Sequence, residues 1–290
     1  MTNFHGALPP EGMLGFSEAI YGQDADPRLT ATLPMELPGG GRPNSNYRYT
    51  FSEKMNGWDV YAFQVALNSH QASIKIAEDG FFGPITKDAV VREQRNHHLA
   101  DDGVAGPVTQ DAIASAEARI AETAHMVPVG LLKGVAEGES GLQFAAVSGP
   151  NWNASYDAGI TQDNLLADEL TTLSKWSRAF NLRVSFGELA VKLRKQFDAY
   201  LGMAGAKTAR DAWYCAVLYH NWPAAADKLA SGQFDSWRYF AVDGSGVGRY
   251  YGVDEPAYWV IQASGGRLRT AREWKNAYIA SKVMYVRAWA

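Results

Sequence analysis

The chain has 290 residues, of which 47% are hydrophobic, 12% aromatic and 20% charged. Apolar side chains are numerous enough for two compact cores, so the composition excludes disorder as the default state. The formal net charge of −4 argues against a nucleic-acid partner, because proteins that bind nucleic acids usually carry a basic patch.

A single cysteine, Cys215, excludes an internal disulfide framework. The sequence also lacks a run of about 18 apolar residues, the minimum for a membrane-spanning helix. The first residues, MTNFHGALPPEGMLGF, do not join a basic segment to an apolar one as a signal peptide does. These features predict a protein that is made in the cytoplasm and has no membrane span.

Residues 1–50 are rich in Pro, Gly, Asn and Thr, which predicts an irregular N-terminal arm. From residue 51 onward the sequence shows a regular spacing of apolar residues. Val60, Phe63, Gln64 and Leu67 are spaced i, i+3, i+4 and i+7, which predicts one face of a helix.

An internal repeat follows this helix. Residues 79–86, DGFFGPIT, agree with residues 102–109, DGVAGPVT, at the Asp, at both Gly, at the Pro and at the Thr. Asp-Gly favours a tight turn because glycine accepts a positive φ, and Pro presets φ for the first turn of a helix. The Thr hydroxyl would be available to cap that helix. The repeat therefore predicts helices over 84–95 and 107–120, and with them a small three-helix domain.

The predicted helix at 60–67 and the two D-G-x-x-G-P-x-T turns resemble the peptidoglycan-binding domain found on many wall hydrolases. The resemblance implies a three-helix fold over residues 51–118 and binding to bacterial peptidoglycan. Glu93 departs from the family pattern, because an aromatic residue usually stands beside the Gln there. A helical spacer without a ligand is the alternative.

After Pro128 the sequence is mostly helical in pattern, and it predicts a helix over 128–139. An apolar stripe is formed by Val129, Leu132, Val135 and Ala136, and Glu139 falls on the same stripe. Desolvation would raise the pKa of a carboxyl group on such a face. A carboxylic acid that keeps its proton near neutral pH is what a general acid for glycosidic cleavage requires. The alternative is a helix-end glutamate whose carboxylate reaches solvent.

Four segments, in order, resemble the superfamily of lytic transglycosylases and goose-type lysozymes. They are GVAEGESGLQ at 134–143, DAGITQDN at 157–164, LYHNWP at 218–223 and EPAYWV at 255–260. The resemblance implies an α-rich, lysozyme-like catalytic domain over residues 119–290. It also implies cleavage of the β-1,4 bond between MurNAc and GlcNAc, with Glu139 as the acid and base.

The same resemblance implies substrate-binding roles for Ser140, Gln162, Tyr219, Asn221 and Tyr258. Gln162 and Asn221 would contact sugar amides or hydroxyls, and Tyr258 would aim its hydroxyl at the acid. The segments depart from the family pattern at Thr161, which replaces a Met, and at Trp222, which replaces a small residue.

Hydrolysis and lytic transglycosylation both remain open. A hydrolase normally uses two carboxylates, about 5–5.5 Å apart for retention or about 6.5–9.5 Å apart for inversion. In a lytic transglycosylase one acid suffices, because the C6 hydroxyl of the sugar attacks C1. Asp157 and Asp163 are the candidates for a second catalytic carboxylate beside Glu139. Either could instead be a turn residue, which is a common role of aspartate.

Three other functions are alternatives to cleavage of the glycan. A zinc amidase would need ligands at a defined spacing, and the histidines form no H-E-x-x-H pattern. A cysteine amidase would use Cys215, but its apolar surroundings in the sequence predict a buried, inert thiol. A non-catalytic wall-binding protein of a virion or cell wall is the third. The histidines are His5, His70, His97, His98, His125 and His220.

The sequence thus predicts a modular lysis enzyme that is similar to a phage endolysin. Its partner would be bacterial peptidoglycan, with no nucleic acid, no metal and no cofactor, and the protein would act as a monomer. It would accumulate in the cytoplasm of the producing cell and act on the wall after release.

Overall fold

The computed structural model describes residues 50–55, 58–71, 75–148, 156–166 and 173–283. The predicted arm at residues 1–50 lies outside these ranges, apart from Thr50. Within them the fold is mainly α, as the sequence predicts, with ten helices and five short strands. None of the helices in the described ranges is both long enough and apolar enough to cross a membrane.

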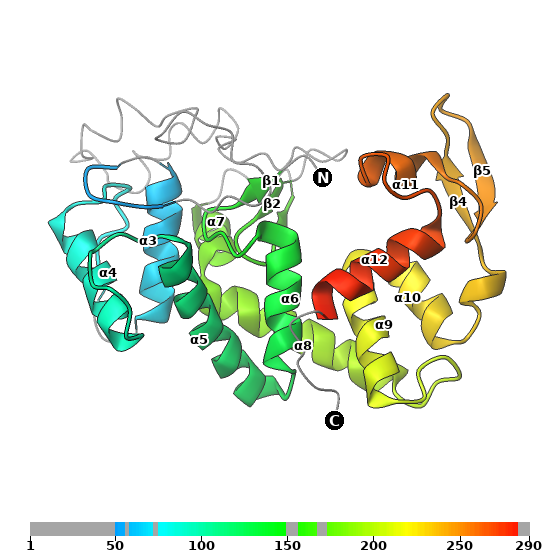
Figure 1. The fold of residues 1–290 in the computed structure, drawn as a ribbon, viewed down its shortest axis with the longest axis horizontal. Coiled ribbons are helices and arrows are strands. Elements are labelled where there is room, and N and C mark those ends of the chain that lie inside the picture. The colour runs from blue at the N-terminus through cyan, green and yellow to red at the C-terminus, as the bar shows by residue number, and fades with distance from the viewer. Residues whose placement is uncertain (1–49, 56–57, 72–74, 149–155, 167–172, 284–290) are drawn as a thin grey trace. The chain divides into compact units, whose positions relative to one another are not determined.

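Figure 1 shows the order of the elements along the chain. The helices are α3 (Trp58–His70), α4 (Pro84–Asn96), α5 (Pro107–His125), α6 (Val129–Ser140), α7 (Leu173–Phe180), α8 (Leu182–Tyr200), α9 (Ala209–Asn221), α10 (Pro223–Ala230), α11 (Tyr258–Ala263) and α12 (Ala271–Val283), with a 3-10 turn, η3 (Phe234–Ser236). The strands are β1 (Val147–Ser148), β2 (Tyr156–Ala158), β3 (Asp163–Leu165), β4 (Arg238–Val242) and β5 (Gly248–Gly252).

The described residues form two compact units. The first unit contains residues 50–121 and 136–188, and the second contains residues 122–135 and 189–283. The domain division expected after residue 118 falls inside α5. In the first unit, α3, α4 and α5 supply the three helices that the repeat predicts.

A buried glutamine organises the first repeat turn. The Nε2 of Gln64 in α3 donates to Asp79 Oδ1 at 2.8 Å, to the Phe81 carbonyl at 3.1 Å and to Thr86 Oγ1 at 3.1 Å. Its Oε1 accepts from the Gly80 amide at 2.7 Å. One fully buried amide thus holds the turn and the start of α4 against α3.

The second repeat turn contains the same network. Gln94 in α4 donates from Nε2 to Asp102 Oδ1 at 2.7 Å, to the Val104 carbonyl at 3.0 Å and to Thr109 Oγ1 at 3.3 Å. Its Oε1 accepts from the Gly103 amide at 2.8 Å. The repeat in the sequence is therefore a repeat of a polar network, with one glutamine on the preceding helix for each turn.

The glycines and threonines of the repeat have different tasks. Gly80 and Gly103 have φ values of 66° and 74°, a conformation that side chains other than glycine rarely adopt. The prediction that Thr86 caps its helix is wrong. Gly83 is the N-cap of α4 and has no side chain with which to cap it. The Thr86 hydroxyl, three positions later, accepts from Gln64 instead.

Stacked phenylalanines fill the core between these elements. The ring of Phe63 lies 4.6 Å from Phe51, 6.0 Å from Phe82 and 6.1 Å from Phe144, measured between centroids. All four rings are buried. Because Phe144 follows α6 in the chain, the core of the repeat region also includes residues from the predicted catalytic part.

A small antiparallel sheet with the order β1-β2-β3 completes the first unit. Residues 159–162 connect β2 to β3. Gly159 in this turn has a φ of 76°, and a Cβ there would overlap the Ala179 carbonyl oxygen of α7. The hairpin can therefore lie against α7 only because residue 159 has no side chain.

The second unit is built from α9, α10 and α12 with the β4–β5 hairpin. Thr208 caps α9 in a capping box, in which Thr208 Oγ1 accepts from the Asp211 amide at 3.1 Å. Gly134 of α6 packs directly on the Lys282 carbonyl of α12, where a Cβ would overlap it. The Thr208 cap thus fixes the N-terminal end of α9, the helix that carries Tyr219 and Asn221.

Candidate functional site

Glu139 is the penultimate residue of α6. In the stripe that leads to it, Leu132, Val135 and Ala136 have no exposed surface, as predicted, whereas Val129 is half-buried. The Glu139 side chain itself is half-buried. Gly141, with a φ of 65°, directly follows the last residue of the helix and donates its amide to the Glu137 carbonyl at 2.9 Å. The carboxyl group is thus carried at the edge of a core, where the chain leaves the helix.

Ser140 joins the end of α6 to the hairpin. Its side chain is buried, and its Oγ lies 3.0 Å from the Ala136 carbonyl and 2.8 Å from the Ile160 carbonyl. A serine hydroxyl has one hydrogen, so it shares this hydrogen between the two acceptors. Ser140 thus lies in the interior. Its hydrogen bond to Ile160 joins the end of α6, which carries Glu139, to the β2–β3 turn.

Gln162 occupies a strained position in that turn. Its φ of 54° lies in the left-handed region, which is uncommon for residues other than glycine. Its Nε2 donates to the Gly159 carbonyl at 2.9 Å and to the Ala146 carbonyl at 3.4 Å. The side-chain amide of Gln162 therefore braces its own turn and joins it to Ala146, the residue that precedes β1. Strain of this kind is concentrated at functional sites.

Asp157 and Asp163 lie on opposite faces of the hairpin. In the β2–β3 register Asp157 pairs with Asn164, and Asp163 pairs with Ala158. Successive side chains of a strand alternate between faces, so the two pairs project in opposite directions. The Asp157–Asn164 hydrogen bond of 2.7 Å agrees with their common face.

The two faces have different environments. Asp163 shares its face with the fully buried Ala158, and its carboxylate accepts from Thr161 Oγ1 at 3.1 Å and from Ser185 Oγ at 3.3 Å. Asn164, on the Asp157 face, is exposed. Asp163 thus bonds inward to α8, whereas Asp157 lies on the face that reaches solvent.

The other three predicted residues belong to the second unit. Tyr219 and Asn221 lie in the last turn of α9, where Tyr219 is half-buried and Asn221 is exposed. Tyr258 opens α11 and is 46% exposed, with its ring against Gly244 of the β4–β5 loop. The structure therefore places Glu139, Ser140 and the hairpin residues in one unit, whereas Tyr219, Asn221 and Tyr258 belong to the other.

A cluster of aromatic rings surrounds Trp222, which follows Asn221. Its ring centroid lies 5.1 Å from Trp259, 5.3 Å from Trp237, 5.5 Å from Tyr239 and 5.8 Å from Trp274. Trp222, Trp237 and Trp259 are half-buried, so parts of their faces reach the surface. The sequence marked Trp222 only as a departure from a family pattern and did not predict this cluster.

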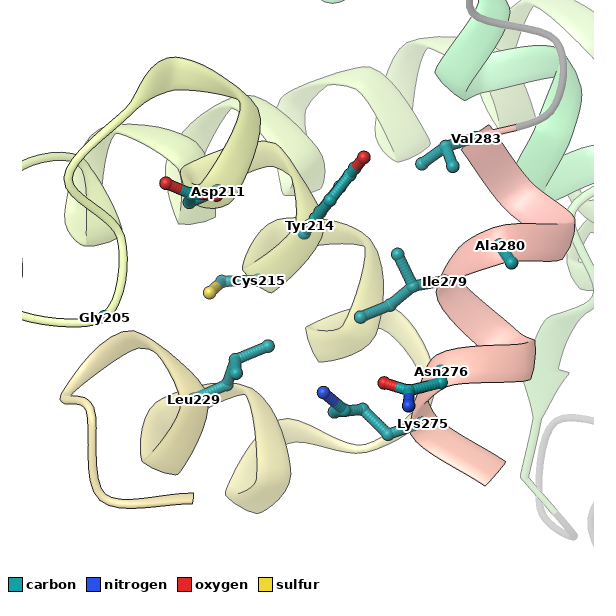
Figure 2. A pocket seen from close by; sticks show the side chains of 10 residues that line it. All are labelled: Gly205, Asp211, Tyr214, Cys215, Leu229, Lys275, Asn276, Ile279, Ala280 and Val283. Atoms are coloured by element: carbon teal, nitrogen blue, oxygen red, sulfur yellow. The ribbon is translucent and has the colours of Figure 1, made fainter. Parts of the chain in front are cut away.

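A cavity of about 410 Å³ opens between α9 and α12 in the second unit (Figure 2). Its lining includes Asp211, Tyr214, Cys215 and Lys275. Cys215 is fully buried, as predicted, and burial raises the pKa of its thiol to about 12. Because the thiolate is the nucleophilic form, this environment disfavours a cysteine mechanism.

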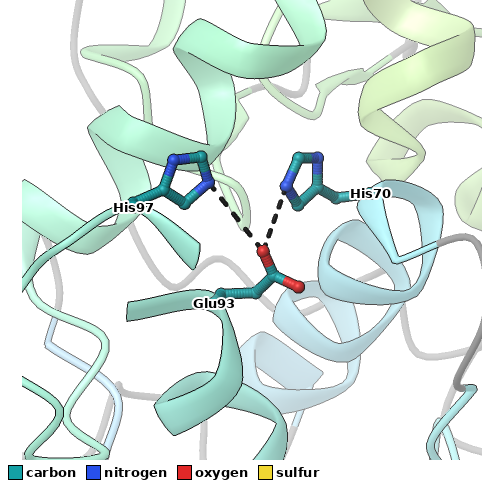
Figure 3. Close-up of side chains that lie close together, drawn as sticks. All are labelled: His70, Glu93 and His97. Atoms are coloured by element: carbon teal, nitrogen blue, oxygen red, sulfur yellow. Dashed lines mark ion pairs between the residues drawn. The ribbon is translucent and has the colours of Figure 1, made fainter. Parts of the chain in front are cut away.

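A buried ionic cluster lies between α3, α4 and α5 in the first unit (Figure 3). His70 Nε2 is 3.2 Å from Glu93 Oε2, and His70 Nδ1 is 2.9 Å from Glu117 Oε1. Glu117 also pairs with Arg183 of α8 at 3.1 Å. His97 Nε2 lies 3.8 Å from Glu93 Oε2. The sequence singled out Glu93 as a departure from its family but did not predict this cluster.

The protonation of the two histidines differs. Burial alone would lower the pKa of His70, but hydrogen bonds to Glu117 and Glu93 outweigh it and raise the pKa to about 9. Burial lowers the pKa of His97, and the charge on His70 lowers it further. Near neutral pH the cluster thus holds one charged imidazole and one neutral imidazole.

Residues 56–113 match a family model described as "Putative peptidoglycan binding domain". No curated protein matches the chain. One similar solved structure is described as the crystal structure of Burkholderia AP3 phage endolysin. It has 16% sequence identity, covers 84% of this chain and 100% of its own chain, and has a TM-score of 0.22, which is too low to assign a common fold. The family match agrees with the resemblance of the repeat region to peptidoglycan-binding domains.

Proposed function

We propose that the chain binds bacterial peptidoglycan through residues 56–113 and cleaves its MurNAc–GlcNAc bond with Glu139 as the general acid. It would work as a modular lysis enzyme of the endolysin type. The single observation that carries the proposal is the position of Glu139. This residue is half-buried at the end of a core helix, and the next residue bonds that helix end to a strained hairpin.

The binding half of the proposal rests on the family match and on the two glutamine networks. The match covers α3, α4 and the first part of α5. Gln64 and Gln94 bond these helices and turns to one another, which is the kind of support that a binding surface requires. A domain held on an insoluble substrate raises the local concentration of any catalytic group attached to it.

The catalytic half rests on the environment of Glu139. A carboxyl group at the border of an apolar stripe is partly desolvated, and desolvation favours the protonated form. The acid would donate its proton to the leaving glycosidic oxygen while charge develops at C1. Water or the C6 hydroxyl of the sugar would then attack C1.

The register of the hairpin restricts the second carboxylate. Asp157 and Asp163 cannot both act from one face, because their strands place them on opposite faces. Asp163 bonds to Thr161 and Ser185 on the inner face. We therefore propose Asp157 as the second carboxylate of a hydrolytic mechanism, and no second carboxylate if the C6 hydroxyl is the nucleophile.

Digestion of purified sacculi followed by mass spectrometry tests the proposal. E139Q should lose most of its turnover and keep its binding to sacculi in a pull-down assay. E137Q is the matched control, since Glu137 lies two positions earlier on the same helix and is also half-buried. Full lysis by E139Q would contradict the proposal and favour a non-catalytic role of this residue.

The products identify the nucleophile. Reducing-end MurNAc would show hydrolysis by a muramidase, and 1,6-anhydro ends would show attack by the C6 hydroxyl. Reducing-end GlcNAc would place the cleavage at the other glycosidic bond and contradict the proposed specificity. Released stem peptides with intact glycan strands would show an amidase and overturn the glycosidase.

A further inference from the structure

Three potential metal ligands converge in the peptidoglycan-binding domain. His70 stands at the end of α3, Glu93 in the last turn of α4, and His97 directly after α4. One ligand atom from each lies within 4.8 Å of the other two. Figure 3 shows the two imidazole rings on either side of the Glu93 carboxylate.

The distances are close to those of a metal shell. Ligand atoms at about 2.0–2.2 Å from a tetrahedral zinc ion lie roughly 3.3 Å from one another. Glu93 Oε2 lies 3.2 Å from His70 Nε2 and 3.8 Å from His97 Nε2. Small side-chain rotations would therefore bring all three atoms to coordination distance. The metal ion would take the place of the Nε2 proton of His70, which is released to solvent.

His97 provides an independent observation. Its Nε2 is buried, and no atom of the described residues forms a hydrogen bond with it. Buried ring nitrogens are normally hydrogen-bonded, so an orphaned one facing a carboxylate needs an explanation. Glu93 Oε2 lies 3.8 Å from this nitrogen, beyond hydrogen-bond distance, so the ion pair between His70 and Glu93 leaves His97 Nε2 without a hydrogen-bond partner.

Glu117 completes the arrangement from outside the shell. It accepts a hydrogen bond from His70 Nδ1 at 2.9 Å, which directs Nε2 toward Glu93 and His97. A histidine ligand typically donates its second nitrogen to a carboxylate in this way. Arg183 in turn bonds to Glu117 and holds the carboxylate in place.

We propose that His70, Glu93 and His97 form a binding site for a divalent transition metal ion, with zinc as the ion that two imidazoles and one carboxylate suit best. Three protein ligands leave a fourth position for water. The ion would tie α3 to α4 and, through Glu117, to α5. The proposed metal site does not depend on glycan cleavage, so its test can succeed or fail independently of the test of Glu139.

Calorimetric titration of the chelator-treated full chain with Zn²⁺ tests the proposal. The native chain should bind one ion, with a rise in Tm that grows with zinc concentration. H97Q should weaken the affinity at least tenfold. H98Q is the matched control, because His98 is the adjacent residue but is exposed and takes no part in the cluster. E117Q should weaken the affinity about 10–100-fold, as expected for a residue that holds a metal ligand in place through a hydrogen bond.

Spectroscopy of the native chain keeps the test valid if a variant does not fold. The imidazole resonances of His70 and His97 should shift on addition of one equivalent of Zn²⁺, while those of His98 and His125 should not. Cobalt bound in place of zinc should show the visible absorption of a four- or five-coordinate ion. No saturable binding, or equal binding by H97Q and H98Q, would overturn the proposal. E139Q should bind zinc as the native chain does, which separates this result from the test of the proposed function.

Discussion

Asp157 and Asp163 are six positions apart in the chain and project from opposite faces of one hairpin. The relationship follows from the pairing of Asp157 with Asn164 and of Asp163 with Ala158. It separates two residues that the sequence alone offered as equivalent partners for Glu139. Asp163 accepts a hydrogen bond from Ser185 in the interior, and Asp157 lies beside the exposed Asn164.

The two aspartates should therefore differ in what their loss affects. D163N removes a carboxylate that accepts hydrogen bonds from Thr161 and Ser185, so it should cost about 1–3 kcal/mol of the free energy of unfolding. D157N should leave stability nearly unchanged and, for a hydrolase, lower turnover on sacculi about 10²–10⁴-fold. Urea denaturation and muropeptide release measure the two effects. Equal losses of stability in both variants would contradict the assignment of faces.

Ser140 should behave as a positioning residue. S140A removes the hydroxyl that lies 2.8 Å from the Ile160 carbonyl and leaves that buried acceptor without its donor. We expect a loss of about 1–2 kcal/mol in the free energy of unfolding. Turnover should fall because the hairpin is no longer fixed beside Glu139, whereas binding to sacculi should stay the same.

A serine with a local bond provides the control for that prediction. Ser281 Oγ donates to the Tyr278 carbonyl at 2.7 Å within α12, so its loss affects only one helix turn. S281A should change stability by less than S140A and should leave turnover unchanged. If both variants show the same loss of turnover, the link between Ser140 and the hairpin does not position the acid.

The glutamine networks of the repeat predict that a negative charge at position 94 destabilises the fold. Q94E replaces the Nε2 that donates to Asp102 with an oxygen, and so places a second carboxyl group beside Asp102. The buried carboxyl of Q94E would have a raised pKa, so its destabilising effect should grow as pH rises and shrink as pH falls. Denaturant midpoints at acidic and neutral pH measure the effect. Q233E is the control, because Gln233 is exposed in the second unit.

The sequence predicted the local elements well. Helices expected at 84–95, 107–120 and 128–139 occur at Pro84–Asn96, Pro107–His125 and Val129–Ser140. Turn glycines, helix-opening prolines and apolar spacing are all encoded within short windows, so they can be read from one sequence. The family match at 56–113 confirms the resemblance that the repeat indicated.

Contacts between side chains of different helices could not be predicted from the sequence. The role of Thr86 was missed because its partner, Gln64, lies 22 positions earlier on another helix. The cluster around Glu93 unites His70, from 23 positions earlier, with His97 on the same helix end. Periodicity identifies the face on which a residue lies but not the residue that faces it across a core.

Two glycines of the first unit offer a matched pair for the last prediction. Gly159 has a φ of 76°, and a Cβ there would overlap the Ala179 carbonyl. Gly187 lies inside α8, and a Cβ there would meet nothing within 4 Å. G159A should thus be strongly destabilising, by roughly 3 kcal/mol or more, because both strain and overlap oppose it. G187A should stabilise the fold by about 0.5–1 kcal/mol, since alanine favours a helix over glycine.

Thermal and chemical denaturation of the two variants measure these shifts, and digestion of sacculi measures their consequence. G187A should digest sacculi as the native chain does. G159A should lose turnover at temperatures where it is still folded, because the hairpin that carries Asp157, Gln162 and Asp163 can no longer lie against α7. A G159A variant with native stability and native turnover would show that the approach of this hairpin to α7 is not required. In that case the position of Glu139 beside the hairpin would not depend on residue 159, and the hairpin would be anchored by other contacts, such as those of Ser140 and Asp163.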